Sequence, residues 1–221
     1  MPGGAVRAGR PHRSPPRVRD AQRDSRDWTD MTLLQVMAAD NAAEVRVRTT
    51  DDAVIGAELA KYGVTYGHWP VLDDAAAIAS DELLARYRDE VGELNADGRY
   101  KHIDIARIHP DDGNPEWPQI AKGAREKFLN EHRHAEDEVR FFAAGRGCFY
   151  LHLGEEVLAT VCEAGDLLSV PAGTLHWFDM GTRPDFIAIR FFEEEDGWIG
   201  DFSGDRISES FPTLDELLIA P

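Results

Sequence analysis

The spacing of hydrophobic and polar positions in the first half of the chain predicts a mixture of strands and helices. Two extended stretches come first, Thr32–Val36 and Glu44–Thr49, and in the second of them valines alternate with charged residues as in a half-buried strand. A helix is then predicted from about Asp51 to Tyr62, because Gly63 suits the left-handed position at which helices end.

A second helix is predicted to begin at the N-cap Ser80 and to reach Leu94. Two acidic residues fall in its first turn, and its apolar residues recur at helical spacing. After the turn Asp97-Gly98, the segment Tyr100–Ile108 is predicted as a strand. Pro118–Lys127 is predicted as a short helix or an irregular crossing segment.

The second half changes to short apolar runs separated by turn residues, which is typical of an antiparallel sandwich or barrel. The predicted strands are Phe128–Phe142, Cys148–Leu153, Val157–Cys162, Leu167–Val170, Leu175–Asp179 and Phe186–Phe192. An acidic run, Glu193–Asp196, is predicted as a solvated loop, and a short helix is predicted near Leu214–Ile219. The predicted fold class is therefore mainly β with peripheral helices (α+β).

Composition agrees with one globular domain. The chain has 221 residues, of which 43% are hydrophobic and 29% charged, a mixture that excludes collagen-like and wholly disordered proteins. No apolar run is long enough to span a bilayer and no secretory signal is apparent, so a cytoplasmic location is expected. From Met31 onward the net charge is −20, which disfavours nucleic acid and anionic membranes as partners.

Residues 1–30 differ from the rest of the chain. They are rich in Arg and Pro, carry a net charge of +3 and show no apolar period, so we expect a disordered leader. Alternatively, Met31 is the natural start. A transit peptide is disfavoured by four Asp and several Pro, and contact of the leader with nucleic acid remains a further alternative. Residues 31–221 are then predicted to form a single domain.

Three of the eight histidines stand in one constellation, His132-Arg-His134-Ala-Glu-Asp-Glu138 and then His176. On a continuous strand His132, His134 and Glu138 would share a face, and a neighbouring strand would bring His176 to the same point. Three imidazoles and one carboxylate hold a divalent transition metal and leave two adjacent octahedral positions open. The sequence therefore predicts an open metal site, and Arg140 has the same parity as its ligands.

The remaining histidines are interpreted as ordinary polar or core residues. The two cysteines, Cys148 and Cys162, lie in predicted strands and are interpreted as buried thiols, with a bridge between them left open.

At these motifs the sequence resembles the cupin superfamily. The pattern His132-x-His134-x₃-Glu138-x₆-Gly145 is similar to the first cupin motif, and Gly165-x₅-Pro171-x-Gly173-x₂-His176 is similar to the second. Glu126 stands where the first motif often has glycine, and Met180 where the second can have asparagine, but neither departure changes a ligand. The resemblance implies an antiparallel β-barrel of the jelly-roll, or double-stranded β-helix, type.

Within the cupins, the chain from about Tyr62 to Phe211 is similar to bacterial acireductone dioxygenases. The similarity is strongest in Glu-His-Arg-His-Ala-Glu-Asp-Glu-Val-Arg-Phe-Phe and Val-Pro-Ala-Gly-Thr-Leu-His-Trp-Phe-Asp-Met-Gly. It implies a methionine-salvage enzyme that cleaves 1,2-dihydroxy-3-keto-5-(methylthio)pentene with O₂. Fe(II) in this family gives 4-methylthio-2-oxobutanoate and formate, whereas Ni(II) gives 3-(methylthio)propanoate, formate and CO.

The resemblance also suggests which residues meet the substrate. One Fe(II) or Ni(II) per chain and a monomeric enzyme are expected. Arg140 and Arg190 are candidates for orienting the anionic enediol through charge-assisted hydrogen bonds, with a structural ion pair as the alternative for each. Candidates for the apolar wall around the methylthio tail, for which core packing is the default interpretation, are Phe128, Phe142, Phe178 and Trp198.

Two other interpretations stay open. One is a different cupin oxidase or dioxygenase with three histidines and a glutamate, for example a Mn(II) enzyme of the oxalate type. The other is a non-catalytic cupin that binds a metal or small ligand. The intact ligand set and the sequence around it favour the acireductone dioxygenase.

Overall fold

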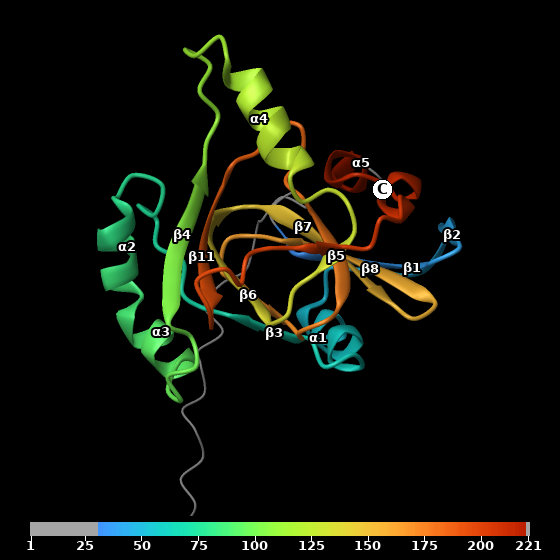
Figure 1. Ribbon diagram of the computed structural model, residues 1–221, viewed down its shortest axis with the longest axis horizontal. Coiled ribbons are helices and arrows are strands. Elements are labelled where there is room, and N and C mark those ends of the chain that lie inside the picture. Colours follow the sequence, from blue (N-terminus) through green and yellow to red (C-terminus); the bar gives the residue numbers. More distant parts are fainter. Residues whose placement is uncertain (1–30, 220–221) are drawn as a thin grey trace, which may run out of the picture.

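The computed structural model describes residues 31–219, so the predicted leader lies outside the described residues. Two antiparallel sheets form the body of the molecule (Figure 1). In spatial order, the first sheet contains β12 (Asp201–Phe202), β5 (His132–Arg133), β10 (Leu175–Asp179), β7 (Gly147–Leu153), β8 (Glu156–Cys162), β1 (Leu33–Ala38) and β2 (Asn41–Thr49). The second contains β3 (Thr65–His68), β9 (Asp166–Val170), β6 (Glu138–Gly145), β11 (Phe186–Phe192) and β4 (His102–Ile108).

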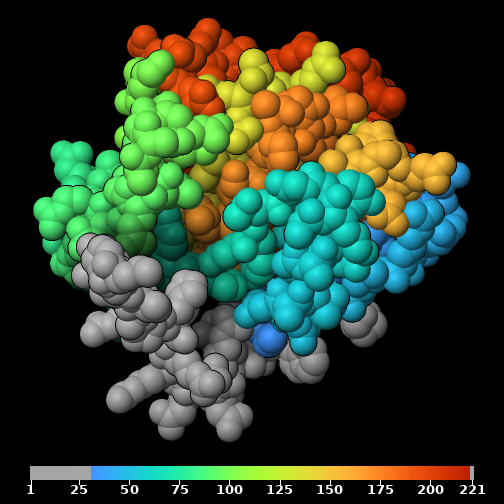
Figure 2. Space-filling view, turned by 90° about the horizontal axis from the view of Figure 1, so that it is seen from below, coloured from blue at the N-terminus to red at the C-terminus, as the bar shows by residue number. Residues whose placement is uncertain are grey.

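The helices lie around the sheets rather than between them. They are α1 (Asp52–Ala60), α2 (Ser80–Arg86), α3 (Arg88–Leu94), α4 (Trp117–Glu126), the 3₁₀ helix η2 (Ile207–Ser210) and α5 (Leu214–Ile219). In Figure 1, α2 and α3 stand beside β4, whereas α5 lies at the opposite side of the molecule. In the space-filling view from below, the cyan surface around α1 and a green surface to its left both border orange-coloured residues of the second half of the chain (Figure 2).

Three apolar clusters follow from the alternation of side chains along the strands. Phe142, Phe149 and Phe186 belong to the cluster between the two sheets. The outer face of the second sheet packs against α2 and α3, with Phe141 and Leu83 in that cluster. The outer face of the first sheet packs against η2 and α5. The two antiparallel sheets confirm the predicted fold class.

Most predicted elements are confirmed, including the strands Leu175–Asp179 and Phe186–Phe192 at their predicted bounds and a helix at α4. The predicted continuous strand Phe128–Phe142 is wrong. The chain leaves the first sheet after β5 and enters the second sheet at β6, so residues between the two strands form a corner.

The predicted helix from Ser80 to Leu94 is also not continuous. Tyr87 interrupts it with a ψ of 15°, separating α2 from α3, and the N-cap is Ala79 rather than Ser80. Tyr87 is buried and its hydroxyl donates to the carbonyl of Pro70, so tertiary packing overrides the helical pattern. The predicted half-buried strand at β2 is an edge strand on which Val45 is 45% exposed.

The two cysteines are free and buried. They lie on the neighbouring strands β7 and β8, but Cys148 packs in the cluster outside the first sheet and Cys162 in the cluster between the sheets. Because the side chains are on opposite faces, a bridge between them is not formed. Within residues 31–219, no helix is both long and apolar enough to cross a membrane.

Candidate metal centre

A pocket opens between the two sheets and brings together nine of the ten predicted site residues. The first sheet and its flanking loops contribute Phe128, His132, His134, Phe149, Phe178, Met180 and Trp198, and the second contributes Ala106, Glu138, Arg140, Phe142, Phe186, Ala188 and Arg190. His176 is buried directly behind this lining, opposite His132.

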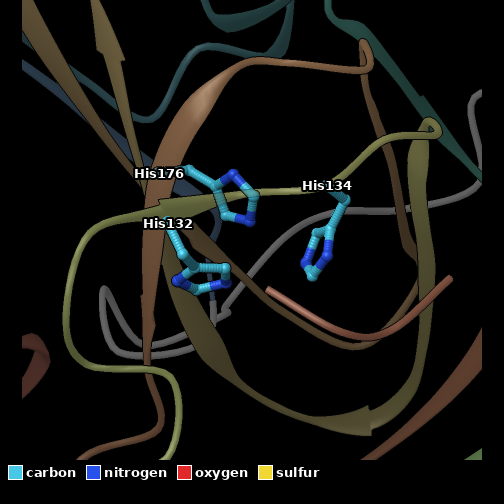
Figure 3. Close-up of side chains that lie close together, drawn as sticks. All are labelled: His132, His134 and His176. Carbon is cyan, nitrogen blue, oxygen red and sulfur yellow. The ribbon is translucent and has the colours of Figure 1, made fainter. Parts of the chain in front are cut away.

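Three histidines converge at one wall of the pocket. His132 on β5 pairs with His176 on β10 in the antiparallel register, and His134 follows β5 by one residue. One ligand nitrogen from each ring lies within 4.8 Å of the other two, and all three side chains are buried. Figure 3 shows the rings turned toward one another. Side chains far apart in the sequence thus form a single cluster.

A backbone carbonyl fixes the orientation of each ring. Nδ1 of His132 lies 2.8 Å from the carbonyl oxygen of Asn130, and Nδ1 of His176 lies 2.8 Å from that of Thr174. Nδ1 of His134 lies 3.1 Å from the carbonyl oxygen of Ile199. A carbonyl only accepts, so each Nδ1 carries the hydrogen and each Nε2 directs its lone pair into the cluster.

Glu138 contacts two of the three histidines. Its Oε2 lies 2.6 Å from Nε2 of His176 and 3.6 Å from Nε2 of His134. Oε2 of Glu138 and Nε2 of His176 are buried and lack a well-aligned hydrogen bond within the described part of the chain. The break between β5 and β6 removes the predicted strand parity, but the corner still returns Glu138 to the histidines.

The electrostatics of the cluster favour a neutral pair of histidines beside an ionised carboxylate. Burial and the neighbouring His176 lower the pKa of His132 to about 4, and burial lowers the pKa of His134. Burial alone would raise the pKa of Glu138, but Arg140 and His176 hold it well below its usual range. The Glu138 carboxylate outweighs burial and raises the pKa of His176. Nε2 of His176 and Oε2 of Glu138 are the two atoms between which a proton or a divalent cation would be held.

The donor set fits a divalent transition metal. Imidazole nitrogens suit iron, nickel, copper and zinc, and one buried carboxylate offsets part of the charge of the ion. The three imidazoles with inward Nε2 atoms and the orphaned Oε2 of Glu138 lie together at the wall of the pocket. The cluster therefore has the chemistry of an open divalent metal site.

Both predicted arginines line the same pocket. Nη2 of Arg140 lies 2.8 Å from Oε1 of Glu138, the oxygen that faces away from the histidines. Arg190 is bound at two points by Asp104. Burial lowers the pKa of Arg140, and the Glu138 carboxylate opposes that effect.

The predicted apolar wall is continuous with the core between the sheets. The Phe178 ring lies 4.8 Å from the Phe149 ring and 6.4 Å from the Phe142 ring, measured between centroids. Phe142 is buried, whereas Trp198 is 39% exposed at the pocket mouth beneath the Lys127 ammonium. Phe142 and Phe178 therefore line the pocket and pack in the core at the same time, whereas Trp198 lines the pocket from an exposed position.

Sequence reasoning missed several lining residues and all three carbonyl partners of the histidines. Phe186 and Ala188 have the strand parity of Arg190, and this alternation was a usable signal for them. The carbonyl of Ile199 carries no sequence signal, because any residue supplies a carbonyl and the contact spans 65 positions.

Comparison with known proteins identifies the family. The model of the ARD/ARD' family matches residues 57–200. "Acireductone dioxygenase 2" of Nocardia farcinica (strain IFM 10152) is 76% identical over 191 residues, which cover 86% of this chain and 100% of that relative. The acireductone dioxygenase of Saccharopolyspora erythraea is 50% identical over 188 residues, covering 85% of this chain and 98% of that relative.

A solved structure supports the fold independently. Acireductone dioxygenase from Bacillus anthracis, with a cadmium ion in its active center, superimposes with a TM-score of 0.65 at 23% identity, covering 78% of this chain and 99% of that chain. At this identity the likeness shows the fold, which is that of a cupin. The family match and the close relatives together establish that the chain belongs to the ARD/ARD' family of acireductone dioxygenases.

Proposed function

We propose that this chain cleaves the acireductone 1,2-dihydroxy-3-keto-5-(methylthio)pentene with O₂. The observation that carries the proposal is the convergence of three imidazoles, each oriented by a backbone carbonyl, at the wall of a pocket that two arginines also line. Membership of the family supports the same reaction. The proposed products are 4-methylthio-2-oxobutanoate and formate with Fe(II), or 3-(methylthio)propanoate, formate and CO with Ni(II).

The proposed ligands of one Fe(II) or Ni(II) ion per chain are His132, His134, Glu138 and His176. Such an ion, when bound, would supply a Lewis acid for an enediol. The carbonyls behind the imidazoles hold the ligand atoms in place before the ion arrives, so little ordering is needed on binding.

Each group around the cluster has a proposed role in holding the substrate. Arg140 and Arg190 neutralise and orient the enediolate through charge-assisted hydrogen bonds. The proposed wall around the methylthio tail, which also excludes water from the anionic end, consists of Phe128, Phe142, Phe178 and Trp198.

The cellular setting is part of the proposal. We infer that the reaction serves methionine salvage in the cytoplasm, that the enzyme works as a monomer, and that residues 31–221 form one catalytic domain.

The ligand assignment is tested by His134→Ala. The substitution removes one of the proposed ligands of the ion. Bound metal and dioxygenase activity are therefore expected to fall together, by at least about tenfold. Metal content by mass spectrometry and substrate consumption by absorbance are the two measurements. His102→Ala, on the exposed end of β4, is the matched control and should retain both. Full metal content in His134→Ala would remove His134 from the ligand set.

A further inference from the structure

Three charged residues stand side by side across the second sheet. Asp104 on β4 pairs in register with Arg190 on β11, and Arg190 pairs in register with Arg140 on β6. Residues directly opposite in neighbouring strands project their side chains to the same face. The row Asp104, Arg190 and Arg140 therefore lies on the face that carries the pocket.

Two like charges in direct cross-strand register repel each other, and here each has its own carboxylate. Asp104 Oδ1 accepts from Nε of Arg190 at 2.7 Å, and its Oδ2 accepts from Nη2 at 2.6 Å. On the other side, Glu138 binds Arg140. Both guanidinium groups also lie over the Phe192 ring, at 4.9 Å for Arg140 and 5.2 Å for Arg190.

The carboxylates of Glu138 and Asp104 differ in their position relative to the pocket. Glu138 lines the pocket and contacts the histidines, whereas Asp104 is not among the described residues that line the pocket. The Asp104 side chain is 52% exposed, so its ion pair with Arg190 is screened and contributes little to the stability of the fold. What the two-point contact does supply is a fixed direction for the planar guanidinium.

We propose that Asp104 is a positioning residue that holds Arg190 in the orientation required to bind the anionic substrate beside Arg140. The proposal rests on the proposed function, because it concerns how the acireductone anion is held. Asp104 itself does not contact the substrate. Its two oxygens engage Nε and Nη2 of Arg190, so the Nη1 group takes no part in this ion pair, and Arg190 also lines the pocket.

Removing the Asp104 charge should change the affinity for the anionic substrate in opposite directions for a positioning role and for a purely electrostatic role. Loss of a negative charge near an anion site strengthens anion binding if charge alone matters. If Asp104 positions Arg190, its loss frees the guanidinium and weakens binding instead. An asparagine has one acceptor oxygen, so Asp104→Asn preserves size and removes the two-point contact.

The experiment measures the affinity of the metal-loaded, full-length protein for the acireductone without O₂, so that no turnover occurs. The absorbance of the substrate reports binding, and metal content is checked in each protein. Asp104→Asn should bind about tenfold more weakly than wild type. Asp112→Asn is the matched control, since Asp112 also binds an arginine, the exposed Arg183, at two points, 2.9 and 2.8 Å, and neither residue lines the pocket. This variant should bind the acireductone like wild type.

A second variant background shows whether Asp104 acts through Arg190. In Arg190→Gln the partner of Asp104 is absent, so adding Asp104→Asn should change the affinity for the acireductone less than twofold. Such non-additive effects are expected when two residues act through the contact between them. Unchanged or tighter binding by Asp104→Asn would overturn the proposal, as would a tenfold effect that persists in Arg190→Gln. Failure of the wild type to bind the acireductone would instead refute the proposed function and this proposal with it.

Discussion

At the scale of single residues, short backbone contacts decide the chemistry of the histidines. His132 and His176 each bind the carbonyl two positions earlier in the chain, so a contact within the local loop fixes the orientation of each ring. His134 instead depends on Ile199, in the segment between β11 and β12. Each ring presents Nε2 inward as a result, which is the property a metal ligand needs.

Arg140→Ala tests whether Arg140 serves the proposed binding of the substrate rather than the binding of the metal. The variant should retain its metal, because Glu138 keeps the ion as a partner, and should lose activity by about 10²-fold, the cost of losing one preorganised cation. Steady-state kinetics and metal analysis on the same preparation check both parts. Arg183→Ala, which loses an exposed guanidinium outside the pocket lining, is the control. Full activity of Arg140→Ala would reduce Arg140 to a structural ion pair.

At the scale of elements, Asp179 joins three of them at the end of β10. Its Oδ1 accepts from Nε of Arg125 in α4 at 2.6 Å, and its Oδ2 accepts from the backbone N–H of Leu214, the first residue of α5. The backbone N–H of Gly181 donates to Oδ1 as well. Burial alone would raise the pKa of Asp179, but these donors outweigh it and hold the pKa below its usual value.

Asp179→Asn should therefore destabilise the fold in a pH-dependent way. Because the folded-state pKa is lowered, the charged carboxylate stabilises the fold above the ordinary value of 3.8, and the contribution is lost as the pH falls through the folded-state pKa. We expect a loss of about 2 kcal/mol in the free energy of unfolding at pH 7 and a smaller difference below pH 4. Urea unfolding at both pH values measures this, and an equal loss at both would contradict the assignment.

How much of the fold was predictable from sequence depends on the range of the interaction. Strands β10 and β11 were predictable because each is a short apolar run between turn residues. The break between β5 and β6 was not, because the residues from His132 to Glu138 are polar apart from Ala135, and nothing in them marks the point at which the chain changes sheets. The short strands β3 and β12 were missed for a related reason, since they are held by neighbouring strands rather than by their own pattern.

The same distinction applies to the site. The residue types and spacing around His132 and His176 predicted a metal cluster, and the structure brings the three histidines together. Their convergence rests on the register that places His132 opposite His176, which no local pattern specifies. The pairing of Arg190 with Asp104 likewise depends on long-range register, and it was outside the reach of the sequence.

At the scale of the whole molecule, the site lies where the two sheets meet, and metal binding should be coupled to the stability of both. The three histidines and Glu138 come from β5, β6, β10 and the corner between β5 and β6. An ion bound to all of them links the first sheet to the second. Anything that binds only the folded state stabilises it by mass action.

Adding Ni(II) to the metal-free protein should therefore raise the Tm. At a free metal concentration of about 100 times Kd the gain is about 2.7 kcal/mol, which corresponds to about 5–10 °C for a domain of this size. Differential scanning fluorimetry with and without a chelator measures the shift. The same rise in His134→Ala would place the stabilising ion elsewhere.

The most direct test of the central claim is product analysis after anaerobic reconstitution with Fe(II), followed by exposure to the acireductone and O₂. We expect 4-methylthio-2-oxobutanoate and formate, with a parallel Ni(II) sample giving 3-(methylthio)propanoate, formate and CO. A fully metallated protein that leaves the acireductone unchanged would show that the proposed function is wrong.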